Sequence, residues 1–407
     1  MNRPTLTGDA APPIIVPPTA AAPMLIIALH MLFGDRGKYL GMIIGITFAA
    51  LIMTQQPSIF VGLMSRTFAF IDDVSLPDIW VMDPGVEYVE ESKPMRDTAL
   101  TRVRGVTGVA WAVPMFKAII NIRLPDGQTK SINLTGLDDA TLVGAPPEMA
   151  EGGLADLRQT DGVIVDQEAA TDRLSYVAAD GGVRPLSIGD EVEINDNRAV
   201  VVAISRSSRD FVLVPKAFTT YSRALAWAPP QRRQLTYVLV KARDGVDPTE
   251  LARRIAAETG LTAQTQAEFR RATLTYWMEN TGIPINFGIS VALGFLVGAA
   301  IAGQSFFNFV RENLDQYAAL KAMGLRTGVV VRMVLLQALV VGVIGYGLGV
   351  GIAAIFGSNV KDSVLAFSMV PEILVFAAVG VLAIVSLSAL LGIRQVVRLD
   401  PAVVFRS

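Results

Sequence analysis

Few residues of this 407-residue chain are of the types that carry chemistry. It has one histidine, His30, and no cysteine, so a zinc site, a thiolate nucleophile and a Ser-His-Asp triad lack the residues they need. Two adjacent carboxylate pairs, Asp72 with Asp73 and Asp138 with Asp139, have the composition of acid–base dyads. Both pairs fall in predicted loops, where solvated charges are the simpler interpretation. His30 lies in a short apolar segment and is interpreted as a packed or headgroup-level residue rather than a ligand.

The sequence also lacks the motifs that bind nucleotides or activate water. No GxxxxGK[ST] occurs, so the chain has no P-loop for ATP, and HExxH, GxSxG and a strand-linked GxGxxG are missing. The long apolar runs carry no acid, lysine or arginine at mid-depth, which disfavours a proton relay or an ion-coupled transporter. A net charge of -2 excludes a strongly basic nucleic-acid binder. We therefore predict no catalytic, cofactor or metal site, and a source of energy outside this chain.

One polar stretch stands between two long apolar runs. It is residues 311–324, RENLDQYAALKAMG, flanked by residues 285–309 and 329–356. Because apolar runs enclose it, the stretch must lie in water at one membrane surface, joined directly to two spanning helices. Its residues are good helix formers, and Gly324 stands where a helix usually ends. We interpret residues 311–328 as a stiff helical hairpin that another protein pushes.

Four charge-free runs are long enough to cross a membrane, because each exceeds the ~20 residues that a hydrocarbon layer of ~30 Å requires. Buried helices of a soluble protein are a poor alternative for four such runs in a chain with 52% hydrophobic residues. The predicted fold class is a polytopic α-helical membrane protein with a large α/β domain between its first and second spans. The predicted spans are residues 39–62, 284–310, 329–357 and 372–393.

Lysines and arginines near the span ends predict the orientation. They gather before the first span, between the second and third, and after the fourth, whereas the loop between spans three and four carries only Lys361. Both termini and the hairpin are therefore predicted to be cytoplasmic, and residues 63–281 periplasmic. A signal peptide at the N-terminus is disfavoured because the Ala-rich stretch precedes the apolar run. The other predicted segments are a disordered tail (1–23), an interfacial helix (24–38), a short periplasmic loop (358–371) and a cytoplasmic tail (394–407).

The periplasmic region has the pattern of a mixed α/β domain. A turn sequence, Pro125-Asp126-Gly127, joins two strand-like runs into a predicted hairpin. Further along, the order strand, helix, strand is what a small α/β subdomain needs. We expect two subdomains: residues 66–135 with 232–280, and an inserted one at 136–231. The other predicted strands are 162–166, 191–205, 235–241 and 261–264, and the predicted helices are 247–258 and 268–278.

Small residues recur four positions apart within the spans. The pairs are Gly41 with Gly45, Gly294 with Gly298, Gly345 with Gly349, and Gly347 with Gly351. Such spacing allows helix backbones to approach closely in lipid. Packing within one protomer and a dimer interface both remain open at this point.

These features together resemble a known family. One span, a large extracytoplasmic domain and three further spans are the layout of ABC-transporter permeases related to MacB, LolC/LolE and FtsX. The residues Leu320-Lys321-Ala322-Met323-Gly324 resemble the family signature LKAxG after the second span. The C-terminal Leu399-Asp400-Pro401-Ala402 and Phe405-Arg406 resemble its DPxxxxR tail. The run from residue 287 to 324 most resembles the DevC-type branch, in which permease and ATPase are separate chains.

The resemblance implies a homodimer in the bacterial inner membrane, worked by a cytoplasmic ATPase dimer that binds the ATP and Mg. It further implies a periplasmic adaptor, an outer-membrane channel, and movement of the outer domain as a lever, called mechanotransmission. Where the family has Glu-Ile-Gly, this chain has Gln316-Tyr317-Ala318, so a charged contact to the ATPase is replaced by a neutral one. The residues expected to contact the ATPase are Asp315, Gln316, Leu320, Lys321, Ala322 and Gly324.

The leading hypothesis is a permease subunit of a tripartite exporter that moves a lipid-like or amphiphilic compound. One alternative is an FtsX-type signalling protein that controls a periplasmic hydrolase, against which the large two-part outer domain argues. A lipoprotein-releasing permease is another alternative, within the transport class.

Overall fold

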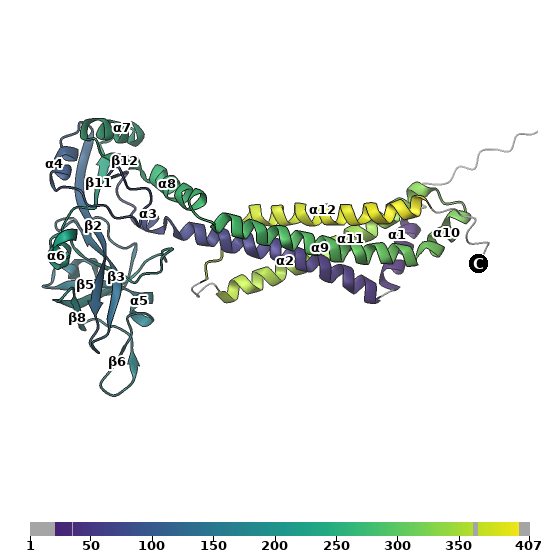
Figure 1. The fold of residues 1–407 in the computed structure, drawn as a ribbon, viewed down its shortest axis with the longest axis horizontal. Coiled ribbons are helices and arrows are strands. Elements are labelled where there is room, and N and C mark those ends of the chain that lie inside the picture. The colour runs from purple at the N-terminus through teal and green to yellow at the C-terminus, as the bar shows by residue number, and fades with distance from the viewer. Residues whose placement is uncertain (1–20, 35, 361–364, 399–407) are drawn as a thin grey trace, which may run out of the picture. The chain divides into compact units, whose positions relative to one another are not determined.

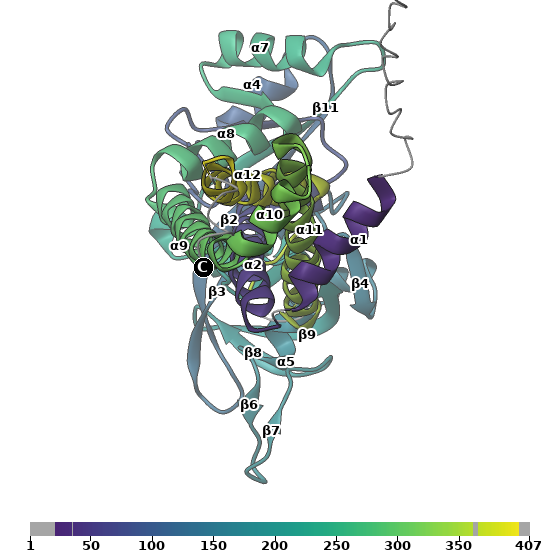
Figure 2. The ribbon, with the colours of Figure 1, turned by 90° about the vertical axis from the view of Figure 1, so that its right-hand side faces the viewer.

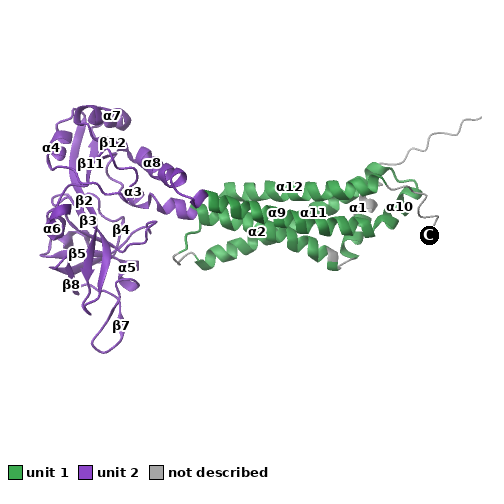
Figure 3. Cartoon of the chain, in the orientation of Figure 1, with its two compact units in different colours: residues 1–61, 285–407 green, residues 62–284 purple. Residues whose placement is uncertain are grey.

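The computed structural model describes residues 21–34, 36–360 and 365–398 of the chain. The chain divides into two compact units, residues 1–61 with 285–407, and residues 62–284, coloured separately in Figure 3. We call them the helical unit and the outer unit. Of the tail predicted over 1–23, residues 1–20 lie outside the described residues, as does the DPxxxxR motif within 399–407; residues 21–23 are not a tail but the start of helix α1 (Ala21–Gly34).

Within the described residues, four helices are long and apolar enough to cross a membrane. This confirms the predicted fold class, with the α/β domain lying between the first and second of them. Figure 2 views these helices nearly end on. A short helix, α10, separates the second span from the third (Figure 1). The helices of this unit are α1 (Ala21–Gly34), α2 (Arg36–Arg66), α9 (Ile283–Glu312), α10 (Leu314–Ala322), α11 (Thr327–Val360) and α12 (Pro371–Val397).

The start of α2 differs from the prediction. The interfacial helix was expected over 24–38, but α1 ends at Gly34 and residues 36–38 form the first turn of α2. Arg36 and Lys38 are good helix formers, and the one glycine between them costs only about 1 kcal/mol in a helix. At the other end of the chain, Pro371 opens α12 at a position where its missing N–H is not needed.

Glycines bring α2 close to two other spans. A Cβ on Gly298 of α9 would lie 2.3 Å from the Cβ of Ala49, and one on Gly345 of α11 would lie 2.7 Å from Ile46 Cγ2. Both partners belong to α2. By contrast, Gly347 and Gly351 have no atom within 4 Å of such a Cβ. The question of packing within one protomer or a dimer interface therefore has different answers for different pairs. Close packing within one chain accounts for Gly294, Gly298, Gly345 and Gly349, but not for Gly347 and Gly351.

The outer unit is built on one ten-stranded sheet with strand order β12-β1-β11-β2-β3-β10-β5-β9-β4, in which β8 pairs with both β2 and β9. The 15-residue β2 belongs to both halves, since Met115 pairs with Tyr237 of β11 whereas Phe116 pairs with Gly136 of β3. The strands are β1 (Ile79–Met82), β2 (Val109–Arg123), β3 (Thr129–Leu137), β4 (Glu148–Glu151), β5 (Gly162–Asp166), β8 (Glu191–Ile194), β9 (Asn197–Arg206), β10 (Lys216–Thr220), β11 (Tyr237–Ala242) and β12 (Thr262–Thr265). A separate two-stranded ribbon joins β6 (Tyr176–Val177) to β7 (Val183–Arg184).

The first half of the sheet is covered on both faces. Ile79 and Val81 of β1 pack in a cluster with residues of α4 and α7, and Trp80 and Met82 pack in another with α3 and α8. Alternate side chains of one strand point to opposite faces, so all four residues are buried. The helices are α3 (Ala69–Asp73), α4 (Thr98–Arg104), α7 (Pro248–Thr259) and α8 (Gln266–Glu279).

The second half has its own apolar core, with α5 (Gln167–Thr171) and α6 (Tyr221–Trp227) packed against its strands. The predicted strand 162–166 is β5, with the same bounds. The predicted single strand 191–205 is wrong, because it is a hairpin of β8 and β9. Asn195 and Asp196 turn the chain with φ of 48° and 62°, and both residue types tolerate this left-handed conformation. The predicted subdomain boundary at 135 falls inside β3.

Candidate coupling site

The α10 helix is short and its two ends are held by specific residues. At its start, the buried Asn313 donates its Nδ2–H to the Phe309 carbonyl of α9 at 2.8 Å, and its own carbonyl accepts from Tyr317 N at 3.1 Å. At its end, Gly324 N bonds the Lys321 carbonyl at 3.0 Å and Leu325 N bonds the Leu320 carbonyl at 3.2 Å. These two backbone hydrogen bonds form a Schellman motif, which satisfies carbonyls that a helix end leaves free.

Gly324 is needed for its backbone conformation. Its φ is +99°, in the region that L side chains rarely adopt, and no atom lies within 4 Å of a Cβ built on it. Space is therefore available for a side chain, and the conformation is what favours glycine. The end of α10 depends on this residue.

The six predicted coupling residues do not all lie on one surface. Those that are exposed are Asp315, Gln316, Ala322 and Gly324. Leu320 and Lys321 are half-buried, and their neighbours Tyr317 and Ala318 are fully buried against the helical unit. The exposed side of α10 is thus a surface made of its first turn and its last turn.

Lys321 has a structural contact that the sequence did not predict. Its Nζ donates to the Val396 carbonyl at 3.0 Å, in the last turn of α12. The same carbonyl also accepts from the Arg398 backbone N–H, and a cation at the C-terminal end of a helix interacts favourably with the helix dipole. The side chain therefore attaches α10 to the end of the fourth span.

Two further residues were missed by sequence reasoning. Met323, the variable position of the LKAxG signature, is 71% exposed beside Gly324 and adds an apolar contact area to the surface. Tyr317, in contrast, is fully buried and donates its hydroxyl to Gln337 Oε1 of α11 at 3.0 Å. Tyr317 could have been singled out because it departs from the family's Glu-Ile-Gly, but nothing in the sequence predicts Gln337 as its partner.

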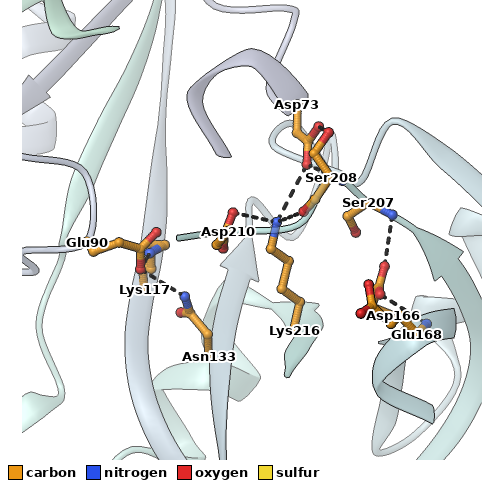
Figure 4. Close-up of polar contacts among 10 residues, drawn as sticks. All are labelled: Asp73, Glu90, Lys117, Asn133, Asp166, Glu168, Ser207, Ser208, Asp210 and Lys216. Carbon is orange, nitrogen blue, oxygen red and sulfur yellow. Dashed lines mark hydrogen bonds and ion pairs between the residues drawn. The ribbon is translucent and has the colours of Figure 1, made fainter. Parts of the chain in front are cut away.

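The outer unit contains a buried cluster of charged groups (Figure 4). Lys216 Nζ lies 2.8 Å from Asp210 Oδ1 and 3.6 Å from Asp73 Oδ2, and Lys117 Nζ lies 2.6 Å from Glu90 Oε2. Burial raises the pKa of the Asp210 carboxyl to about 6, although the nearby Lys216 opposes this. The cluster joins β2, β10 and the loop after β9 to α3.

Neither carboxylate pair forms an acid–base dyad, because each carboxylate has a partner of its own. The loop prediction is wrong for Asp72 and Asp73, which end helix α3. Asp73 accepts from Ser208, Asp138 accepts from Thr141, and Asp139 accepts from Ser222. Asp72 lies 3.8 Å from Arg270. Across the part of the chain that the structure describes, no group of three or more acidic or histidine side chains is placed to hold a metal ion.

Two family models match the chain. The model of the MacB-like periplasmic core domain matches residues 39–258, and the model of the FtsX-like permease C-terminal domain matches residues 288–401. No curated protein matches. Among solved structures, the extracellular domain of the noncanonic ABC-type transporter YknZ from Gram-positive bacteria is 13% identical, with a TM-score of 0.32, 46% of this chain covered and 98% of that chain. The periplasmic region of MacB from Actinobacillus actinomycetemcomitans is 15% identical, with a TM-score of 0.35. The match covers 52% of this chain and 96% of that chain.

Proposed function

Because this chain belongs to the MacB/FtsX-like family of ABC-transporter permeases, we propose that it is the membrane subunit of an ATP-driven export pump. The resemblance read from the LKAMG signature is confirmed by the two matched models, both of which describe permease-type domains. The proposed pump works by mechanotransmission and exports a lipid-like or amphiphilic compound. ATP and Mg are bound by a separate cytoplasmic ATPase dimer.

The proposed assembly has further parts. Two copies of this chain lie in the bacterial inner membrane with both termini in the cytoplasm, and a periplasmic adaptor and an outer-membrane channel continue the path. The positions of the arginines and lysines at the span ends support this orientation. The two-part outer unit supports export over the first alternative, an FtsX-type signalling role; a lipoprotein-releasing permease is a further alternative within the transport class.

One observation carries the proposal: α10 is exposed on one side and firmly attached on the other. Its attachments are Tyr317 to α11 and Lys321 to α12, so a force on α10 is delivered to two spans at once. The exposed residues Gln316 and Met323 are then free to contact the ATPase. A helix on a flexible loop would absorb the same force.

The test separates the docking surface from the attachment. Met323→Asp replaces the exposed apolar side chain by a charged one without touching either hydrogen bond, and should reduce co-purification of the co-expressed partner ABC ATPase at least tenfold. Glu372→Lys is the matched control, because Glu372 is exposed in the first turn of α12, far along the helix from Val396. The proposal fails if the ATPase binds Met323→Asp and wild type equally, or if the purified chain alone hydrolyses ATP.

A further inference from the structure

A chain of two hydrogen bonds runs through the apolar interior of the helical unit. The Tyr317 hydroxyl of α10 donates to Gln337 Oε1 of α11 at 3.0 Å, and Gln337 Nε2 donates to the Ala28 carbonyl of α1 at 2.8 Å. All three residues have no exposed surface. The chain thereby connects three separate helices through one amide side chain.

The surroundings of Gln337 show why these two bonds matter. The residue lies within the third span, and its partner Tyr317 belongs to the apolar cluster that includes Leu32, Phe309 and Val334, all fully buried. A buried amide without partners is costly, because no water replaces them. Gln337 uses its oxygen for one helix and its nitrogen for another, so its position depends on both.

The same bonds set α1 apart from the other contacts of α10. Lys321 fixes the end of α10 to α12, whereas only the Tyr317–Gln337 link continues to α1 among the bonds described for these helices. The other side of α1 exposes Ile26, Ile27 and Phe33, an apolar surface suited to the membrane interface. α1 therefore has one apolar side suited to the membrane interface, and one backbone carbonyl that accepts the hydrogen bond from Gln337.

We propose that Tyr317 and Gln337 are positioning residues that make α1 move with α10. When the ATPase displaces α10, the displacement passes through the Gln337 amide, and α1 shifts in the membrane interface. α1 is then a moving part of the coupling apparatus and not a passive anchor. This inference rests on the proposed function only for the source of the displacement.

Substitutions can distinguish a relay from a merely structural bond. Tyr317→Phe leaves the Gln337 oxygen buried without its donor, so it destabilises the protein for either role. The double variant Tyr317→Phe with Gln337→Leu removes both side-chain partners and keeps the volume. It leaves no side-chain polar group unpaired and takes only the Gln337 donor from the Ala28 carbonyl, so it destabilises the protein less than Tyr317→Phe alone. A structural role predicts that the double variant recovers wild-type behaviour, whereas a relay predicts that stability returns and transmission does not.

The chain has no cysteine, so spin labels can be placed at single introduced cysteines. A pair at His30→Cys and Gln316→Cys reports the distance from α1 to α10, and both positions are exposed. A control pair at Gln316→Cys and Arg394→Cys reports the distance from α10 to α12, which Lys321 holds. In the purified chain alone, the double variant should broaden the first distance distribution at least twofold and leave the second unchanged.

The complex with the ATPase provides the second measurement. With a non-hydrolysable ATP analogue, wild type should show a shift of the α1 label relative to α12, and the double variant should lose that shift. An unchanged width in the chain alone together with an unchanged shift in the complex overturns the relay. Failure of the ATPase to bind wild type refutes the proposed function instead, and the measurement on the chain alone still decides the relay.

Discussion

Replacement of Gly298 by alanine tests the close approach of α2 and α9. A Cβ at this position lies 2.3 Å from the Cβ of Ala49, 3.1 Å from its Cα and 3.2 Å from the Gly45 carbonyl oxygen. Carbon atoms in favourable contact are ~3.5–4.0 Å apart, so the two helices must separate by about 1.2–1.7 Å at this point. Ala49 has no exposed surface, its Cβ is fixed to the backbone, and its Cα is also within 3.1 Å, so no side-chain rotation relieves the clash.

The expected energy follows from two opposing effects. Overpacking of this kind costs ~1–3 kcal/mol, and replacing a mid-helix glycine by alanine returns ~0.5–1 kcal/mol. Gly347→Ala is the matched control, since no atom lies within 4 Å of its Cβ and only the favourable effect remains. The free energies of unfolding of the two variants should therefore differ by about 1–3 kcal/mol, with Gly298→Ala the less stable.

Both variants can be unfolded in mild detergent and followed by circular dichroism of the helices. Equal free energies of unfolding for the two variants would refute the described contact between α2 and α9. A loss of stability in Gly347→Ala instead would indicate that this glycine meets a second chain, which is the dimer interface left open by the sequence.

Two further predictions concern the outer unit and the end of α10. Because burial raises the pKa of Asp210 from 3.8 to about 6, the folded protein keeps a proton there that the unfolded chain has released. Stability from this group is greatest below pH 4 and should fall by about 3 kcal/mol in all as the pH rises through 6 to about 7. Asp210→Asn should flatten this dependence in urea unfolding, followed by the four tryptophans, which all lie in the outer unit. Gly324→Ala should cost ~1–2 kcal/mol of local stability and speed hydrogen exchange at Leu325 N. Gly328→Ala is the control and should have neither effect, because Gly328 has an ordinary φ and equally open space around its Cβ. Equal exchange rates in the two variants would contradict the argument from the backbone conformation of Gly324.

The parts of the fold that follow from local patterns were predictable. A charge-free apolar run of some 20 residues predicts a spanning helix, because inside a bilayer the backbone must satisfy its own hydrogen bonds, and the four candidate spans were predicted from this pattern. β5 was also predicted with its observed bounds, since turn residues border a short β-branched run. The hairpin of β8 and β9 was missed because Asn195 and Asp196 interrupt an otherwise continuous strand pattern by only two residues.

The contacts that attach α10 to α11 and α12 could not be predicted from the sequence. The LKAMG signature indicated the helix and its end at Gly324, which depend on neighbours in the chain. The partners of Tyr317 and Lys321 lie 20 and 75 positions away, so only the packing of the spans brings them together. For the same reason the small-residue pairs could not be divided into internal and open ones before the helices were placed.

The shared strand β2 limits how the outer unit can be simplified by engineering or by evolution. Excising the predicted insert, residues 136–231, would cut β3 two residues before its end and remove β10. Residues 133–135 of β3 would then lose the strand they pair with and expose bare amide and carbonyl groups. A stable shortened version must instead end β2 near Met115 and rejoin the chain near Tyr237, where the two strands already pair. Natural relatives with a smaller outer domain should carry their deletion between those two points.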